Sequence, residues 1–371
     1  MTSRRMAASA LARQSEVPFL EYASPNRVDV SRKHCLIFFI PGNPGLIDYY
    51  APFLRTLRQL LDEREAKEGC RYAFHIYGRN LLGFEDRDHE PAFGTTTAEG
   101  VRIQPYTLED QIQCLCDQVH QVNYSALQGS AAGSSGRAFD KVILIGHSVG
   151  AYIALEIFNR HHHRRLRSDG QLTNDHASSD PLATVELKAG ILLFPTVVHI
   201  AQSSSGQKLA LIRRVQFLDM FAHYIAKGFV NLWPRWILDA IVRRFLGFPE
   251  HAALATVRFL ASNDGIWQAL HMGKDEMETI TEEKWSEDLW EIQGAEAGTG
   301  MGAKFFFYFA ETDHWVADEC RDEFIENRRR HAKGKTRIVV DEEKIPHAFC
   351  IHHSETVAEK VRLWIEDIAG P

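Results

Sequence analysis

The pentapeptide GHSVG at 146–150 has residue types and a spacing that fit nucleophilic catalysis. It directly follows the apolar run KVILI and leads into the helical pattern AYIALEIF. In a nucleophile elbow a serine occupies a tight strand-to-helix turn. Glycines two residues to either side let the backbone fold back without Cβ clashes. The motif therefore predicts that Ser148 is a nucleophile and that Gly146 and Gly150 shape its turn.

A second turn-forming segment, PGNPG at 41–45, follows the apolar run CLIFFI. In hydrolases with such an elbow, the loop after this early strand donates one backbone N–H to the oxyanion. The residue after the nucleophile donates the other. We therefore expect the backbone amides of Asn43 and Val149 to form the oxyanion hole, with Gly45 or Leu46 as alternatives to Asn43.

The acid and the base of such a site follow the serine in the chain order serine, acid, histidine. Asp313 follows the apolar run KFFFYF within the segment AETDHWV, where its side chain is expected to project from the carboxyl edge of the sheet. His347 lies between the run TRIVV and the last helical pattern. The order predicts Asp313 as the acid and His347 as the general base, with Asp318 and Asp341 as alternative acids.

The remaining histidines are interpreted as non-catalytic, although 18 of them occur in the chain. His147 adjoins the nucleophile, and adjacent residues on a tight turn point apart, so a structural role is expected. His314 is too close to the proposed acid in sequence to fold back onto it. His352 and His353 open the last helix and are expected to be exposed. The 161–163 histidines stand beside arginines and predict a solvated loop, not a metal site.

These assignments describe acyl transfer through a covalent intermediate. Ser148 attacks an ester carbonyl while His347 accepts its proton, and Asp313 holds the imidazole in the correct tautomer. Water then hydrolyses the acyl-enzyme. This chemistry requires neither a metal nor an organic cofactor.

Short apolar runs and helical patterns alternate along the chain. Most runs are continuous, which is typical of strands buried on both faces of a parallel sheet. The alternation predicts an α/β fold with a doubly wound, mostly parallel sheet. The expected strands are Cys35–Ile40, Tyr72–Tyr77, Lys141–Ile145, Gly190–Phe194, Lys304–Phe309 and Thr336–Val340. The expected helices include Tyr49–Glu68, Thr107–Val122, Ala151–Arg160 and Ser354–Ile368.

A long helical stretch separates the late strands that end at Phe194 and begin at Lys304. It predicts a helical cap or lid at 196–303, inserted into a core made of 1–195 and 304–371. Three further stretches are Gly/Ala/Ser-rich or strongly polar and are expected to be flexible surface loops. These loops are 128–137, 161–181 and 292–303.

The 208–248 segment of the cap is basic and amphipathic, with seven basic and two acidic residues in a chain whose net charge is −7. Aromatic and aliphatic residues alternate with the basic ones; Trp233, Trp236, Ile237, Arg243 and Arg244 are the main candidates for contact with a lipid surface. A basic face opposite a Trp/Ile face is typical of a helix that lies in a membrane interface. A lid helix that packs its apolar stripe on the core explains the same pattern.

Composition excludes several other classes of protein. The 371 residues are 45% hydrophobic and 25% charged, as in globular chains, and the net negative charge argues against a general nucleic-acid binder. Six scattered cysteines form no zinc-like spacing, which indicates reduced thiols in a cytosol-facing protein. The N-terminus lacks the apolar stretch of a secretory signal, and its arginines and serines leave a mitochondrial presequence as an alternative to a frayed leader. The chain contains no stretch of about 18 uncharged apolar residues, so no membrane-spanning helix is expected.

Three segments together resemble the lipid droplet-associated hydrolase family: FFIPGNPGLIDYY (38–50), GHSVGAYIALE (146–156) and LFPTVVHIAQSSSG (193–206). The PGNPG and FPT stretches are more specific than GHSVG, which many hydrolases share. The resemblance implies an α/β-hydrolase fold and a Ser148/Asp313/His347 triad. It also implies residence on lipid droplets and endoplasmic reticulum, and action on neutral lipid esters such as sterol esters. Two alternatives remain: a lipid-droplet organising protein with a weakly active or silent core, and a soluble esterase of small esters.

Overall fold

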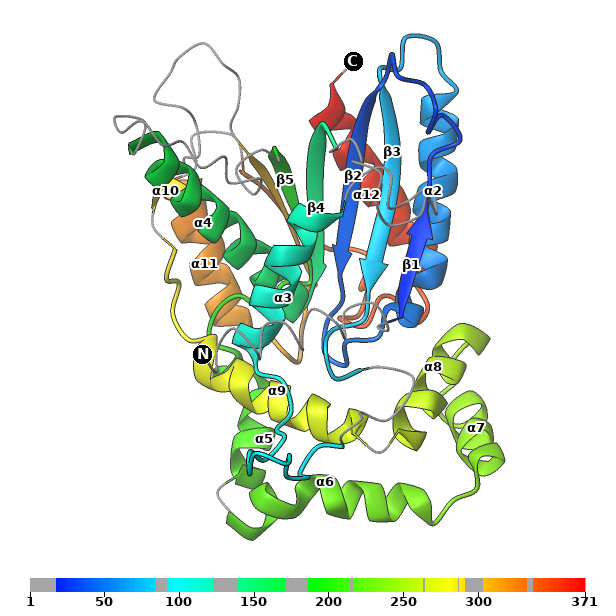
Figure 1. The fold of residues 1–371 in the computed structure, drawn as a ribbon, viewed down its shortest axis with the longest axis vertical. Helices are drawn as coiled ribbons and strands as arrows, with labels where there is room; N and C mark the ends of the chain where they lie inside the picture. Colours follow the sequence, from blue (N-terminus) through cyan, green and yellow to red (C-terminus); the bar gives the residue numbers. More distant parts are fainter. Residues whose placement is uncertain are drawn as a thin grey trace.

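Seven strands of the described chain form one twisted sheet in the order β1-β3-β2-β4-β5-β6-β7, in a computed structural model (Figure 1). β1 runs antiparallel to β3, and the other neighbouring strands are parallel. The strands are β1 (Phe19–Tyr22), β2 (Lys33–Ile40), β3 (Tyr72–Arg79), β4 (Lys141–His147), β5 (Leu187–Leu193), β6 (Lys304–Phe309) and β7 (Thr336–Val340). The six predicted strands are confirmed. The four-residue β1 is an edge strand without a continuous apolar run, and sequence analysis missed it.

The structure describes residues 18–84, 92–122, 139–170, 186–213, 216–262, 264–285, 287–290, 303–331 and 336–370. The predicted loop at 128–137 and almost all of the one at 292–303 lie outside these ranges. Within the described residues, no helix combines the length and the apolarity needed to cross a bilayer.

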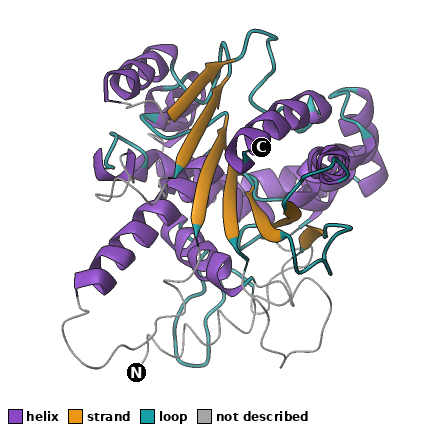
Figure 2. Ribbon diagram, turned by 90° about the horizontal axis from the view of Figure 1, so that it is seen from above, coloured by secondary structure: helices purple, strands orange, loops and turns teal. Residues whose placement is uncertain are grey.

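Helices cover both faces of the sheet, as the view from above shows (Figure 2). One face carries α2 and α12, which pack against each other, and the other carries α3, α4 and α11. The strands are buried on both sides; in β2 every residue after Lys33 is buried. These helices are α2 (Ala51–Glu65), α3 (Leu108–Gln121), α4 (Val149–Gly170), α11 (Asp318–His331) and α12 (Ser354–Ala369). The predicted doubly wound, mostly parallel α/β fold is confirmed.

Two helical segments differ from the sequence expectations. α4 continues to Gly170, so the first ten residues of the predicted 161–181 loop are helical. The reason is that no Gly or Pro interrupts residues 161–169, and most of these residues are Arg, Leu or His, which tolerate a helix. Residues 171–181 are not described. α11 was not predicted because charged residues dominate its sequence and hide any apolar period.

A group of helices lies between β5 and β6 in the chain, beyond the carboxyl ends of the parallel strands (Figure 1). We call α5–α9 the cap helices: α5 (Ser204–Arg213), α6 (Gln216–Asn231), α7 (Arg235–Arg244), α8 (Glu250–Ala261) and α9 (Gly265–Thr279). The short α10 (Glu287–Trp290) packs instead on α4, and Trp290 contacts Phe305 of β6. The division of the chain into a core (1–195 and 304–371) and a cap (196–303) remains a prediction.

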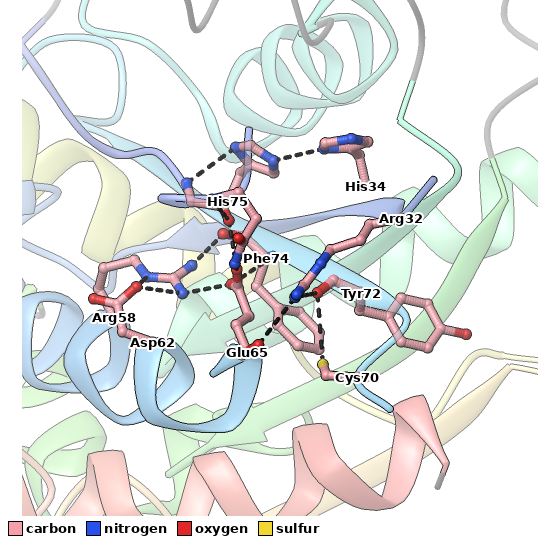
Figure 3. A network of polar contacts seen from close by, with 11 residues as sticks. Arg32, His34, Arg58, Asp62, Glu65, Cys70, Tyr72, Phe74 and His75 are labelled. Atoms are coloured by element: carbon pink, nitrogen blue, oxygen red, sulfur yellow. Dashed lines mark hydrogen bonds and ion pairs between the residues drawn. The ribbon is translucent and has the colours of Figure 1, made fainter. Parts of the chain in front are cut away.

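Far from the cap, a buried polar network joins the amino ends of β2 and β3 to α2 (Figure 3). Arg58 Nη2 lies 2.6 Å from Glu65 Oε1, and both side chains are buried. Glu65 also accepts hydrogen bonds from the Phe74 N–H at 2.9 Å, from the Ser24 hydroxyl, and from Asn26 Nδ2 at 2.9 Å. A buried charge is tolerable when its lone pairs are used in this way, so Glu65 holds the strand edge to the helix.

We expect Glu65→Ala to lower the free energy of unfolding by about 3 kcal/mol, because it removes the buried partner of the Arg58 guanidinium and the acceptor of the Phe74 N–H. Arg58 then keeps its ion pair with the more exposed Asp62, at 2.9 Å. Urea denaturation measures this loss. The matched control is Glu326→Ala, which removes the partner of Arg330 from an exposed ion pair and should change stability little. Equal small effects in both variants would contradict a structural role for the network.

Candidate functional site

The turn between β4 and α4 brings Ser148 into the left-handed backbone region, at φ 54°. A Cβ on Gly146 would lie 2.2 Å from the carbonyl oxygen of Gly150, and a Cβ on Gly150 would lie 2.3 Å from that of Ile40. Both distances are far below van der Waals contact. The structure therefore requires glycine at both positions, and the turn presses against the end of β2.

The side chains of Ser148, His347 and Asp313 form one hydrogen-bonded chain. His347 Nε2 lies 2.9 Å from Ser148 Oγ, and His347 Nδ1 lies 2.6 Å from Asp313 Oδ2. The other carboxylate oxygen, Asp313 Oδ1, accepts a hydrogen bond from the Trp315 N–H at 2.8 Å. Ser148 directly follows β4, and Asp313 and His347 lie in the loops after β6 and β7. Parallel strands end at one edge of the sheet, and that edge brings them together.

The charge on Asp313 determines where the protons of this chain sit. Burial by itself raises the pKa of Asp313, but the hydrogen bonds from His347 and Trp315 outweigh it and bring the pKa below its usual value. The carboxylate is therefore ionised at neutral pH and accepts the proton on His347 Nδ1. His347 Nε2 is then left as the acceptor for the Ser148 hydroxyl, which is the arrangement that a general base needs.

The two alternative acids lie in other surroundings. Asp318 is exposed and pairs with Arg321 at 3.0 Å. Asp341 is buried, but its carboxylate accepts hydrogen bonds from the Tyr308 hydroxyl and, at 2.7 Å, from the Ile345 N–H. Asp341 thus shapes the turn that leads to His347, while Asp313 carries the carboxylate that contacts the imidazole.

His147 has a specific structural partner on either side of its ring. Its Nε2 lies 2.9 Å from the His347 carbonyl oxygen, and its Nδ1 lies 2.7 Å from the Tyr50 hydroxyl. Burial lowers the pKa of His147 to about 3, so the ring is neutral. A carbonyl oxygen only accepts, so Nε2 carries the proton and Nδ1 accepts from Tyr50, whose oxygen accepts the Gly42 N–H at 3.1 Å. This relay ties the PGNPG loop to the backbone of His347.

The other histidines are dispersed. His314 lines the cavity beside Ser148, with its ring centre 5.9 Å from that of His347. His352 is exposed and His353 is half-buried. His161 is buried within α4, so the expectation of a solvated loop at this position is wrong. Among the residues that the structure describes, no three His, Cys, Asp or Glu side chains are grouped to hold a metal ion.

The PGNPG loop passes directly beside Ser148. A Cβ on Gly42 would lie 3.0 Å from Ser148 Cβ, and Asn43 lines the same cavity as Ser148. The Leu46 N–H is engaged by the Pro44 carbonyl at 2.8 Å, which argues against Leu46 as an oxyanion donor. The use of the Asn43 and Val149 amides, with Gly45 as an alternative, remains a prediction.

A cavity of about 240 Å³ opens beside Ser148 and His347. Residues of the core line it on one side, and Phe248, Gly273 and Glu276 line it on the cap side. The FPT segment reaches it as well, since Thr196 lines the cavity and its N–H lies 3.4 Å from the Ser148 carbonyl oxygen. The rest of the lining is Pro44, Tyr49, Tyr50, His147, Ile200, His314, Trp315, Ala348, Cys350 and Ile351. Sequence analysis did not name Tyr50, Thr196 or Glu276 as site residues. Tyr50 and Thr196 lie in the quoted segments 38–50 and 193–206, which could have pointed to them, whereas no local motif marks Glu276.

α7 presents two different apolar faces. Leu238 and Val242 are buried, 7% and 2% exposed, whereas Trp236 is 71% exposed. Of the other candidates for lipid contact, Trp233 and Arg244 are exposed, Ile237 is half-buried, and Arg243 pairs with Asp239 at 2.8 Å. We call the exposed apolar residues of this region the outer face: Tyr224, Ile225, Phe229, Leu232, Trp233, Trp236, Phe245 and Leu246. One stripe of the helix therefore docks on the protein while the other is turned to the surroundings.

Comparison with known proteins places the chain among hydrolases. Residues 33–350 match the model of a family described as lipid-droplet associated hydrolase. The lipid droplet-associated hydrolase of Mus musculus is 25% identical over 91% of this chain and 87% of its own length. That of Gallus gallus is 24% identical over 90% and 85%, respectively. Among solved structures, a peroxisomal alpha-beta-hydrolase of Saccharomyces cerevisiae shares the fold, with a TM-score of 0.51 and 11% identity over 96% of this chain and 83% of its own.

We expect Gly146→Ala to lower the free energy of unfolding by about 3 kcal/mol, because the new methyl group meets backbone that cannot move aside. Thermal and urea unfolding measure the effect. The control is Gly228→Ala in α6, where a Cβ meets nothing within 4 Å and should stabilise the helix by about 0.5–1 kcal/mol. A Gly146→Ala protein as stable as the unmodified chain would show that the turn has room for a Cβ at this position.

Proposed function

The chain belongs to the lipid droplet-associated hydrolase family, and from this premise we propose that it cleaves lipid carboxylic esters by serine catalysis. The observation that carries the proposal is the hydrogen-bonded chain from Ser148 through His347 to Asp313, with both donor–acceptor distances below 3.0 Å. Its position at the carboxyl edge of the sheet, beside a cavity, supports the same reaction.

In the proposed mechanism Ser148 Oγ attacks the ester carbonyl while its proton passes to His347 Nε2. Asp313 stabilises the imidazolium that forms. The Asn43 and Val149 amides stabilise the tetrahedral oxyanion, and each such donor is worth about 3 kcal/mol in the transition state. His347 then protonates the departing alcohol, and water, activated by the same ring, releases the acid from Ser148.

The cavity supports a neutral, largely apolar substrate. Its wall includes the side chains of Ile200, Phe248, Trp315 and Ile351 and, among the residues that line it, neither Lys nor Arg. Its volume lies below the roughly 300–1,000 Å³ of typical small-molecule sites. We therefore assign the cavity to the part of the substrate next to the scissile carbonyl. A sterol ester or another neutral lipid then requires the cap helices to move.

The outer face supports binding of the protein to a lipid surface. It combines exposed Trp and Phe side chains with Arg235 and Arg244, and α6 forms an outer edge of the molecule, away from the sheet (Figure 1). Apolar side chains flanked by basic ones suit an interface with anionic lipid. The names of the relatives give lipid-droplet association, and we propose that this chain resides on droplets and on the cytosolic side of the endoplasmic reticulum.

We expect a fluorophosphonate probe to label the protein at Ser148, and both labelling and ester turnover to vanish in Ser148→Ala and His347→Ala. Asp313→Asn should lower turnover about 10⁴-fold, because an amide favours the wrong imidazole tautomer. The matched control is Asp318→Asn, which should retain full turnover. A folded protein that the probe fails to label would favour a silent core that only organises droplets.

We expect the combined Phe229→Ser, Trp236→Ser and Phe245→Ser protein to lose more than tenfold in flotation with liposomes, since each exposed side chain contributes about 1.5–3 kcal/mol when buried in lipid. Its melting temperature and its turnover of soluble esters should be retained. The control is Leu238→Ala on the buried stripe of α7, which should lower the melting temperature and leave flotation of the folded protein unchanged. Retained flotation in the triple variant would favour a soluble esterase of small esters.

A further inference from the structure

α9 carries one buried carboxyl group into the cavity beside the nucleophile. Glu276 is 7% exposed and lines the cavity together with Ser148 and His347. Asn43 Nδ2 donates to Glu276 Oε1 at 3.0 Å and to the Ala269 carbonyl oxygen at 3.0 Å. The cap thus holds the side chain of the residue whose backbone amide is the proposed oxyanion donor.

The surroundings of Glu276 favour its neutral form. Burial raises the pKa of Glu276 to about 8; the Asn43 amide opposes this rise, and the neighbouring Asp275 carboxylate adds to it. The other titratable groups that line the cavity come from the 3-10 turn η2 (Ile47–Tyr50), from the nucleophile turn and from the loops after β6 and β7. They are Tyr49, Tyr50, His147, His314, His347 and Cys350. None of these lining residues is a Lys or Arg that would compensate a carboxylate at this position.

We propose that Glu276 is a positioning residue: it fastens the Asn43 loop to α9, and a negative charge on its side chain opposes the oxyanion in the cavity that it shares with Ser148. The inference rests on the proposed function of Ser148. A carboxylate in a buried cavity opposes a second negative charge strongly, because little water screens the two. The cap residue therefore sets the alkaline limit of turnover.

The test is the pH profile of kcat/KM for a soluble p-nitrophenyl ester in the full chain and in Glu276→Gln. We expect kcat/KM of the unmodified protein to fall at least tenfold between pH 7 and pH 9.5, and the fall to be absent in Glu276→Gln. A Gln carbonyl can still accept from Asn43, so kcat at pH 6.5 should drop less in Glu276→Gln than in Glu276→Ala. Glu278→Gln, an exposed position on the same helix, is the control and should keep the alkaline fall.

A second measurement does not depend on turnover. A carboxyl whose folded-state pKa is raised stabilises the fold at low pH and loses that contribution as the pH rises toward the folded value. The melting temperature of the unmodified protein relative to Glu276→Gln should therefore decline between about pH 5 and pH 8 and level off above. An unchanged alkaline fall in Glu276→Gln, with turnover still dependent on Ser148, would overturn the inference and leave the proposed function standing. Turnover that survives Ser148→Ala would instead overturn the proposed function.

Discussion

The contact between Gly150 and the carbonyl end of β2 is the constraint on which the site depends. β2 and β4 are neighbours in the sheet, so the loops that follow them leave the same edge side by side. Without a Cβ at Gly150 the turn at Ser148 packs directly on Ile40, and the PGNPG loop comes to lie against Ser148. A larger residue would separate the two loops. The hydrogen bonds from Tyr50 to His147 and from His147 to the His347 carbonyl oxygen then connect this contact to the loop after β7. The loops after β2, β4 and β7 are therefore held in fixed positions relative to one another.

Charge within the site is limited to few groups. The Asp313 carboxylate is held ionised by its hydrogen bonds, whereas burial keeps His147 neutral and raises the pKa of Tyr50 well above its usual value. Glu276 enters the same cavity from the cap, and burial raises its pKa, which favours the neutral carboxyl group. A cavity of neutral walls around one fixed carboxylate favours a reaction in which positive charge develops on His347 and negative charge develops on the substrate.

The cap helices face two environments at once. α7 buries Leu238 and Val242 against the protein and exposes Trp236, and the same split continues into Phe245, which is 83% exposed. α9 lies on the inner side, where Glu276 and the Ala269 carbonyl hold Asn43. The inner and outer layers of the cap are in contact, since α6 packs on both α8 and α9. A lipid surface that engages the outer face would therefore act close to the helix that holds the Asn43 loop.

Short-range patterns in the sequence by themselves determined six of the seven described strands, the doubly wound sheet, the turn at Ser148 and the places of Asp313 and His347 after late strands. Each of these depends on residues that adjoin one another, and a continuous apolar run or a Gly-x-Ser-x-Gly spacing records them directly. Asp313 was preferred over Asp341 from the sequence, but both follow a strand, and the packing of β6 and β7 decides which carboxylate reaches His347. The contacts of Tyr50 and Glu276 were invisible for the same reason: their partners lie 97 and 233 residues away. The sequence of α7 likewise showed apolar residues that suit both contact with lipid and packing on the core. Only the neighbours of α7 in the folded chain decided which of its apolar stripes is buried.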